Sequence, residues 1–228
     1  MKIAVIQHRI RPTFAEDAEA LSAAVTKACD AHARVVVCPW VPSLAAAEAQ
    51  ERAEMLESFT RCAEGTTLLL AFRAAESSDG ARIRPTPLGT TALMLGDECL
   101  SRAAYAAAEA AGARAWVWRP RSTSDLQSEA VLEQAIAASA TYVGLILLAE
   151  CSGAEPGEIG HGASAVLYLG DVIAEASEPD DVLIVDVDAP VGPPEPREPM
   201  PPLPPILEQR LAVHEGRKPD VGYLADLS

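Results

Sequence analysis

The order of its apolar segments constrains the fold of this chain more than any other feature. Short runs with many β-branched residues alternate with longer segments of helical spacing, and each short run predicts a buried strand. The strands are expected at residues 2–7, 34–39, 66–72, 90–95, 115–118 and 142–149, and then at 163–169, 172–177 and 182–187. Strands that alternate with helices and end in an antiparallel group predict an α/β protein in which helices cover sheets.

Capping residues mark the ends of the expected helices. Thr13 and Glu16 have the spacing of a capping box, which predicts a helix up to about His32. Ser43 is a candidate cap for a long helix that should stop at Gly65. Further helices are expected over residues 101–111 and 126–139, loops over 74–87 and 152–162, and a two-residue hairpin turn at 170–171.

The composition excludes several classes of partner. The chain has 228 residues and a net charge of −15, because it contains 33 acidic and only 18 basic residues. We therefore predict no nucleic acid and no anionic membrane as partners. No apolar run reaches the roughly 18–20 residues that cross a bilayer. The first residues run directly into a strand pattern and lack the apolar core of a signal peptide.

The cysteines predict a cytoplasmic protein with reduced thiols. Their number is odd, they are widely spaced, and none belongs to a Cys-x-x-Cys pair. The four histidines have no metal-ligand spacing, and the glycines follow no phosphate-loop pattern, so no metal and no other cofactor is expected. The five cysteines are Cys29, Cys38, Cys62, Cys99 and Cys151.

The composition changes after residue 188. Residues 190–205 contain nine prolines in sixteen positions, which predicts an extended, polyproline-like conformation. We therefore expect a domain over residues 1–188, followed by a proline-rich C-terminal arm and tail over residues 189–228. This segment is either a loose tail or an arm laid along a neighbour, and its apolar residues favour the arm. Those residues are Leu203, Ile206, Leu207 and Leu211.

Five segments, in order along the chain, are similar to segments of the nitrilase superfamily of carbon–nitrogen hydrolases. They are the opening Lys-Ile-Ala-Val-Ile-Gln, Val-Val-Val-Cys-Pro-Trp at 35–40, Thr-Pro-Leu-Gly at 86–89 with the strand that follows, Gly-Ala-Arg-Ala-Trp-Val-Trp-Arg-Pro at 112–120, and residues 160–175. The resemblance implies an α-β-β-α sandwich of four layers, to which the proline-rich C-terminal arm is added.

The resemblance also implies a catalytic glutamate, lysine and cysteine. A thiolate that attacks an amide carbon needs a base to remove its proton and a cation to stabilise the developing charge. In this chain Trp40 stands at the place of the glutamate and Gly96 at the place of the cysteine. No lysine occurs between Lys27 and Lys218. The segment in which the lysine belongs contains Arg73, Arg82 and Arg84 instead, which we interpret as solvated loop charges.

The residues near the vacated positions each have two interpretations. Trp40 either fills the old pocket as part of the core or forms a stacking wall for an aromatic or cationic ligand. Asp97 and Glu98 either cap the start of a helix or form a carboxylate pair that binds a cation or an amine. Cys99 is either a small buried residue or a displaced nucleophile.

Three functions remain open. The favoured hypothesis is a nitrilase-like pseudoenzyme, a non-catalytic binding, regulatory or assembly subunit that turns over no simple amide, nitrile or carbamoyl compound. The alternative is an amidase-like carbon–nitrogen hydrolase that uses Cys99 with Glu98 or another acid. The third is an unrelated α/β enzyme or binding protein. The sequence identifies neither a small-molecule ligand nor a partner protein.

The resemblance implies a homodimer or heterodimer that pairs through the helices at residues 101–111 and 126–139. The first of these helices has small residues at helical spacing, which let another helix approach closely or pack on the chain's own sheet. We expect the arm, residues 190–211, to reach onto the partner. The small residues are Ala103, Ala104, Ala107, Ala108 and Ala111.

Overall fold

The structure is a computed structural model, and it describes residues 1–62, 65–69, 82–122, 125–155 and 158–187. Backbone contacts divide the chain into two units, Met1–Gly192 and Pro193–Ser228, and all described residues belong to the first. The predicted proline-rich arm therefore lies outside the described residues.

The first sheet is built around β1 (Lys2–Arg9). Its central residues are buried, as expected for a strand covered on both faces. β2 (Val35–Val37) runs parallel to β1 on one side, and β12 (Asp181–Asp186) runs antiparallel on the other. The remaining strands of this six-stranded sheet are β3 (Thr67–Leu69) beside β2, β8 (Cys151–Glu155) at the end of β1, and β9 (Glu158–His161) beside β8.

The second sheet also has six strands, in the order β11-β10-β7-β6-β5-β4. Its centre consists of three parallel strands, β5 (Gly89–Leu95), β6 (Ala115–Arg119) and β7 (Leu145–Leu148). Antiparallel strands complete it on both sides. These are β4 (Arg82–Thr86) beside β5, β10 (Ala165–Tyr168) beside β7, and β11 (Asp171–Glu175) beside β10.

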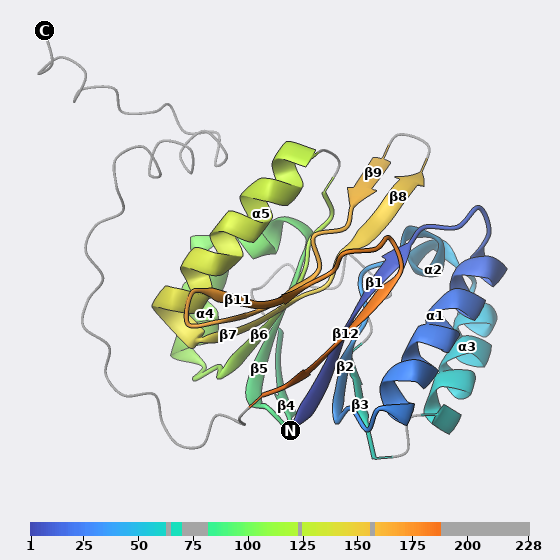
Figure 1. The fold of residues 1–228 in the computed structure, drawn as a ribbon, viewed down its shortest axis with the longest axis horizontal. Helices are drawn as coiled ribbons and strands as arrows, with labels where there is room; N and C mark the ends of the chain where they lie inside the picture. The colour runs from blue at the N-terminus through green and yellow to red at the C-terminus, as the bar shows by residue number, and fades with distance from the viewer. Residues whose placement is uncertain (63–64, 70–81, 123–124, 156–157, 188–228) are drawn as a thin grey trace, which may run out of the picture. The chain divides into compact units, whose positions relative to one another are not determined.

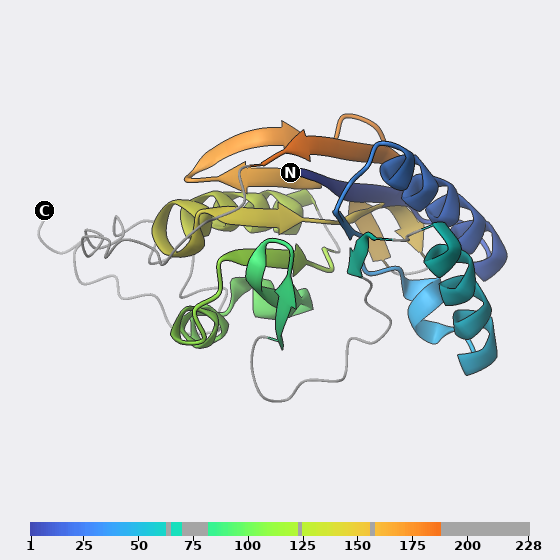
Figure 2. The ribbon, with the colours of Figure 1, turned by 90° about the horizontal axis from the view of Figure 1, so that it is seen from below.

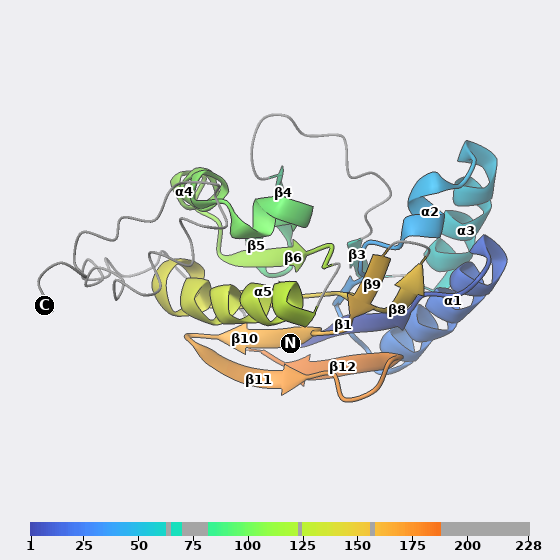
Figure 3. The same cartoon turned by 90° about the horizontal axis from the view of Figure 1, so that it is seen from above.

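Helices cover each sheet on the face that points away from the other sheet (Figures 1 and 3). The helices on the first sheet are α1 (Phe14–Asp30), α2 (Pro42–Ala46) and α3 (Ala49–Cys62), and those on the second are α4 (Arg102–Ala110) and α5 (Asp125–Ala138). A short 3-10 helix, η1 (Gly96–Leu100), joins β5 to α4, and a π-helix, η2 (Ser139–Val143), extends α5. Among the described residues, no helix is long and apolar enough to cross a membrane.

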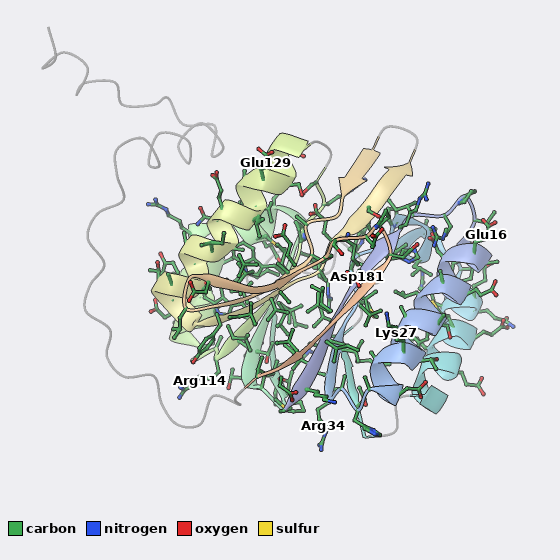
Figure 4. All side chains as sticks on the ribbon, in the orientation of Figure 1. Glu16, Lys27, Arg34, Arg114, Glu129 and Asp181 are labelled. Atoms are coloured by element: carbon green, nitrogen blue, oxygen red, sulfur yellow. The ribbon has the colours of Figure 1, made fainter. Side chains whose placement is uncertain are left out.

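Three groups of buried apolar residues hold these elements together. Successive side chains of β6 point to opposite faces of the sheet and so belong to two different groups. Trp116 and Trp118 pack with α4 and α5, whereas Ala115 and Val117 pack in the group shared by both sheets. A third group joins the first sheet to α1, α2 and α3. Figure 2 shows the ribbon from below, and Figure 4 adds the side chains, with the exposed Glu16 and Glu129 labelled on α1 and α5. The prediction of an α/β protein with two sheets and covering helices is therefore confirmed.

Local signals predicted several boundaries correctly. Thr13 caps α1, and its capping box with Glu16 is complete in both directions. Ser101 caps α4 through a hydrogen bond from the Ala104 backbone N–H to its side chain, at 3.3 Å. Gly112 follows α4 with a φ of +70°, the left-handed conformation that glycine adopts most readily.

The prediction that Ser43 caps one long helix is wrong. The residue before α2 is Val41, and Pro42 occupies the first turn, where its fixed φ and missing N–H are tolerated. Ser43 lies inside α2, and its hydroxyl donates to the Asp17 carboxylate instead. Ala47 is extended and ends α2, so the segment forms two helices.

Two predicted loops contain strands. β4 lies within the expected loop at 74–87 and pairs with β5, and Pro85 is tolerated there because β4 is an edge strand. The expected loop at 152–162 contains most of the β8–β9 hairpin. Both strands depend on pairing with other segments, which a local pattern does not report.

The C-terminal strands differ from prediction in register and in partner. The turn between β10 and β11 is Leu169–Gly170, one residue earlier than expected, with φ angles of +52° and +93°. Such a turn needs positive φ at both central positions, which places Gly170 second rather than first. β12 leaves this group and pairs with β1 in the first sheet.

Candidate functional site

The carboxyl ends of parallel strands from both sheets meet at the candidate site. β5, β6 and β7 are parallel, so Gly96, the residues after β6 and Glu150 lie at one edge of the second sheet. Trp40 follows β2 of the first sheet. Cys151, the residue after Glu150, begins β8 of the first sheet, and its thiol donates to the Trp40 carbonyl at 3.2 Å. The chain thus passes from the end of β7 to the edge at which Trp40 lies. Ends of parallel strands are where open α/β sheets place their ligands.

Trp40 is half-buried and covered by a cation from the same chain. The Arg121 guanidinium lies 4.7 Å from the centre of the Trp40 ring, within the range of a cation–π contact. The indole Nε1 is buried and has no hydrogen-bond partner among the described residues. Trp40 is thus a stacking surface, and Arg121 already occupies the face that an external cation would use.

Gly96 forms a sharp turn between β5 and η1. Its φ is +53°, a conformation that side chains rarely adopt, although an added Cβ would meet no atom within 4 Å. The position expected to hold a nucleophile therefore has space for a side chain but none is present. Arg119 pairs with Leu95 in the neighbouring strand, which places Gly96 beside the end of β6.

Asp97 and Glu98 have different surroundings. The Glu98 Oε2 atom accepts from the Leu95 backbone N–H at 3.1 Å, so this side chain closes the start of η1. The Asp97 side chain is exposed. The contact made by Glu98 is a capping contact, of the kind that satisfies a free N–H at a helix start.

Cys99 is fully buried between the second sheet and its helices. Its side chain has 0% exposure and packs in the same group as Met94, Trp116 and Trp118. Burial raises the pKa of the Cys99 thiol far above its usual range. A backbone hydrogen bond from Arg119 lowers this pKa in part, and the Glu98 and Glu150 carboxylates raise it further. A thiol in such surroundings stays protonated and is a poor nucleophile.

Glu150 is a site residue that the sequence analysis missed. Its side chain is only 2% exposed, and its Oε2 atom accepts from the Ser128 hydroxyl at 2.8 Å and from the Ala163 backbone N–H at 3.1 Å. Its Oε1 atom is buried and has no hydrogen-bond partner among the described residues. The available signal was an acidic residue directly after a buried apolar run, at the carboxyl end of a parallel strand.

Among the described residues, Arg119 and Arg121 supply positive charge at this edge, and the sequence singled out neither of them. Arg119 is 2% exposed, and its charge lowers the pKa of both Cys38 and Cys99, although burial dominates and raises the pKa of Cys38 to about 12. Of the predicted arginines, Arg84 is exposed on β4. Arg73 and the side chain of Arg82 lie outside the described part of the structure.

A second buried polar cluster lies beside the first sheet. His8 Nε2 donates to Asp17 Oδ1 at 2.6 Å, and the Arg11 backbone N–H donates to the same oxygen at 2.8 Å. The Ser43 hydroxyl donates to Asp17 Oδ2. Burial raises the pKa of Asp17, but the hydrogen bonds from His8, Ser43 and Arg11 outweigh it, so the pKa is lowered. All polar atoms of this carboxylate are satisfied, which is typical of a structural contact.

The described surface shows no metal-ligand group, and its groove lies away from the strand ends. Within the described ranges, no group of three or more His, Cys, Asp or Glu side chains is placed to hold a metal ion. A shallow groove of about 880 Å³ lies between α1 and α3. Residues of these two helices alone line it, so it is separate from the strand ends described above.

Comparison with known proteins supports the fold but not a close relationship. No protein-family model and no curated protein matches the sequence. A cysteine-to-serine variant of the amidase from Nesterenkonia sp. AN1, of the nitrilase superfamily, has a TM-score of 0.68 at 17% identity, over 83% of this chain and 92% of that chain. A glutamate-to-leucine variant, which carries the acetamide moiety of fluoroacetamide on its active-site cysteine, has a TM-score of 0.69 at 15% identity, over 82% and 90%.

A likeness at such low identity concerns the fold alone. It agrees with an architecture of two sheets and covering helices. The fold of this chain is therefore similar to that of this amidase.

Proposed function

We propose that this chain is a degenerate member of the nitrilase superfamily that serves as a non-catalytic binding, regulatory or assembly subunit. The observation that carries the proposal is the state of position 96, where a strand-to-helix turn with space for a side chain holds glycine. The four-layer α-β-β-α arrangement belongs to the same proposal, and the three separate groups of buried residues support it.

The other two catalytic positions support the same conclusion. Trp40 has one N–H donor and no basic atom, so it cannot remove a thiol proton. No lysine occurs between Lys27 and Lys218. A base and a nucleophile act as a unit in acyl transfer, and the loss of either removes most of the rate.

An amidase-like hydrolase built on Cys99 is the second candidate. The Glu98 and Glu150 carboxylates both change the pKa of the Cys99 thiol. They act in the wrong direction for a nucleophile, because a nearby negative charge raises the pKa of a thiol. Burial excludes water and substrate from the sulfur in the described state. The non-catalytic function is therefore better supported.

Assembly through α4 and α5 is part of the proposal. The five alanines at helical spacing over residues 103–111 divide between two faces, because Ala104 and Ala108 are buried against the chain's own elements. The others are exposed and leave a small-residue face open to a second helix. These exposed residues are Ala103, Ala107 and Ala111. We propose that residues 190–211 reach onto the partner of a homodimer or heterodimer, because this segment contains several apolar residues.

Covalent labelling tests the absence of a nucleophile. Acrylamide and fluoroacetamide react with the active-site cysteine in glutamate variants of the Nesterenkonia amidase. We expect neither compound to label Cys99 of the wild-type chain at neutral pH, and both to label the Gly96→Cys variant at position 96. Peptide mapping by mass spectrometry identifies the labelled residue, and Gly96→Ala is the matched control.

Two results would contradict the proposal. The first is rapid labelling of wild-type Cys99 together with hydrolysis of a simple amide that Cys99→Ala abolishes. The second is a folded Gly96→Cys variant in which neither compound labels position 96, so that a small amide does not reach this position. In that case position 96 is not the vacated nucleophile position.

A further inference from the structure

The end of the β10–β11 hairpin carries four exposed apolar side chains within six residues of sequence. Tyr168 is 48% exposed and Leu169 51%, and across the turn Val172 is 41% and Ile173 49% exposed. Single exposed apolar residues are normal on a protein surface, but several in one short segment make it a candidate for interaction. We call these four residues the apolar hairpin end.

The apolar hairpin end is held in a fixed position. The Leu169 backbone N–H donates to the Gly144 carbonyl at 2.8 Å, and the Gly170 N–H donates to the Ser139 hydroxyl at 2.9 Å. Leu169 has a φ of +52°, a left-handed conformation that is unfavourable for leucine. Because the Leu169 side chain is exposed, packing within the chain does not offset this cost. Backbone strain of this kind often marks a binding residue.

The outer edge of β11 is protected against pairing with β11 of a second copy. β11 is the outermost strand of the second sheet. Ala174 pairs with Val166 and Val172 with Leu167, so Ile173 lies in a bulge between two paired residues. Bulges and charged ends both discourage edge-to-edge pairing. An antiparallel pair of β11 strands centred on Ile173 would also place Asp171 opposite Glu175 of the other copy.

The charge around the hairpin points to a basic partner. No lysine or arginine occurs between Arg121 and Arg197. The elements α5, β7, β10, β11 and β12 therefore contain neither of these two basic residues. The exposed carboxylates of Asp171 and Glu175 lie at the two ends of β11. A second copy of the chain carries the same net charge of −15, which disfavours self-association here.

We propose that the apolar hairpin end docks an extended segment of a partner protein in which apolar residues are flanked by lysine or arginine. Apolar contact with Leu169, Val172 and Ile173 would supply the affinity. Basic residues near Asp171 and Glu175 would supply the specificity, since opposite charges across neighbouring segments attract and like charges repel. The inference adds a class of partner to the proposed function and does not depend on the absence of catalysis.

Two synthetic peptides of about ten residues test this inference on the full-length chain. Both carry the same alternating valines and isoleucines, and the flanking residues are lysine in one and glutamate in the other. Backbone amide shifts in NMR spectra report the binding site. We expect the lysine peptide to shift the resonances of residues 168–175 in a saturable way, and the glutamate peptide to leave them unchanged.

Three variants separate the apolar and the charged contributions. Val172→Ser with Ile173→Ser should weaken binding of the lysine peptide at least about 10-fold. Asp171→Asn with Glu175→Gln should weaken it about 3- to 10-fold, and about 0.5 M salt should remove the same part of the affinity. Ile83→Ser on the opposite edge strand, β4, is the matched control and should bind as the wild type does. Circular dichroism confirms that each variant is folded.

Several results would overturn the inference. Equal binding of both peptides, no binding of either, or shifts outside residues 168–175 would show that this surface does not select a basic segment. Self-association in sedimentation that Val172→Ser with Ile173→Ser abolishes would assign the surface to a second copy. Binding to phosphatidylcholine and phosphatidylglycerol vesicles that the same variant abolishes would assign it to a membrane.

Discussion

Asp17 and Glu150 are both buried carboxylates, one beside each sheet, and their surroundings differ. Asp17 is 0% exposed, and both of its oxygens accept hydrogen bonds, from His8, the Arg11 amide and Ser43. Glu150 is 2% exposed, and only its Oε2 atom accepts, from Ser128 and the Ala163 amide. A fully satisfied carboxylate joins elements together, whereas a half-satisfied one leaves an acceptor at the strand ends.

Removal of Asp17 should have the largest effect. Asp17→Ala leaves the His8 imidazole, the Ser43 hydroxyl and a backbone N–H without their acceptor in a buried place. We expect the free energy of unfolding to fall by about 3 kcal/mol, measured by urea denaturation. Asp97→Ala, at an exposed carboxylate, is the control and should change it by less than about 0.5 kcal/mol. Equal losses of stability in Asp17→Ala and Asp97→Ala would show that the buried Asp17 carboxylate does not join these elements together.

The pH dependence of stability should follow the same carboxylate. The pKa of Asp17 is lowered in the folded protein. In the unfolded chain this carboxylate has the ordinary pKa of an aspartate, about 3.9, so it binds its proton at a higher pH than in the folded protein. The contribution is therefore complete above the unfolded pKa and is lost as the pH falls through the folded pKa. Unfolding free energies between about pH 6 and pH 3 should fall more steeply for the wild type than for Asp17→Asn. Parallel curves would contradict this assignment.

Substitution of Glu150 should have a smaller effect. In Glu150→Gln the amide oxygen can still accept from Ser128 and from the Ala163 N–H, and the substitution removes a buried charge. We expect a change of at most about 1 kcal/mol in the free energy of unfolding. Ser128→Ala, which removes one donor to Glu150, should also cost about 1 kcal/mol. A loss as large as that of Asp17→Ala would show that Glu150 is a structural contact of the same kind.

The contact between Arg121 and Trp40 should have the smallest effect. Arg121→Gln removes the cation from the exposed side of the ring, and we expect the free energy of unfolding to fall by about 0.5 kcal/mol. Fluorescence quenching by acrylamide should increase, because Trp116 and Trp118 are buried and only Trp40 gains access to solvent. Arg84→Gln, at an exposed arginine on β4, should leave both measurements unchanged.

Most of the fold could be predicted because its signals are local. The capping box of Thr13 and Glu16 forms within one turn of helix, and the runs that become β1, β2, β5, β6, β7 and β10 are apolar enough to predict burial. β4 and the β8–β9 hairpin lack such runs. Their strands exist because distant or adjacent segments offer unpaired backbone groups, and pairing does not depend on an apolar pattern.

The candidate site could be predicted only in part. Trp40 and Gly96 stand at the ends of recognisable strands, so their place at the strand ends follows from the parallel topology. Arg121 and Glu150 become site residues only when strands from different parts of the chain converge. Arg121 has no local pattern that sets it apart from other surface arginines, and Glu150 offers only its position after an apolar run.

The sequence by itself determined the class of the fold, the caps of α1 and α4, and the presence of Trp40 and Gly96 after two of the buried strands. These properties depend on residue identity and on neighbours within a few positions. The tertiary structure alone decided that Cys99 is buried among aromatic residues, that Arg121 covers Trp40, and that β12 joins the first sheet. Each of these depends on contacts between segments far apart in the chain, where burial and charge are set by what the fold brings together.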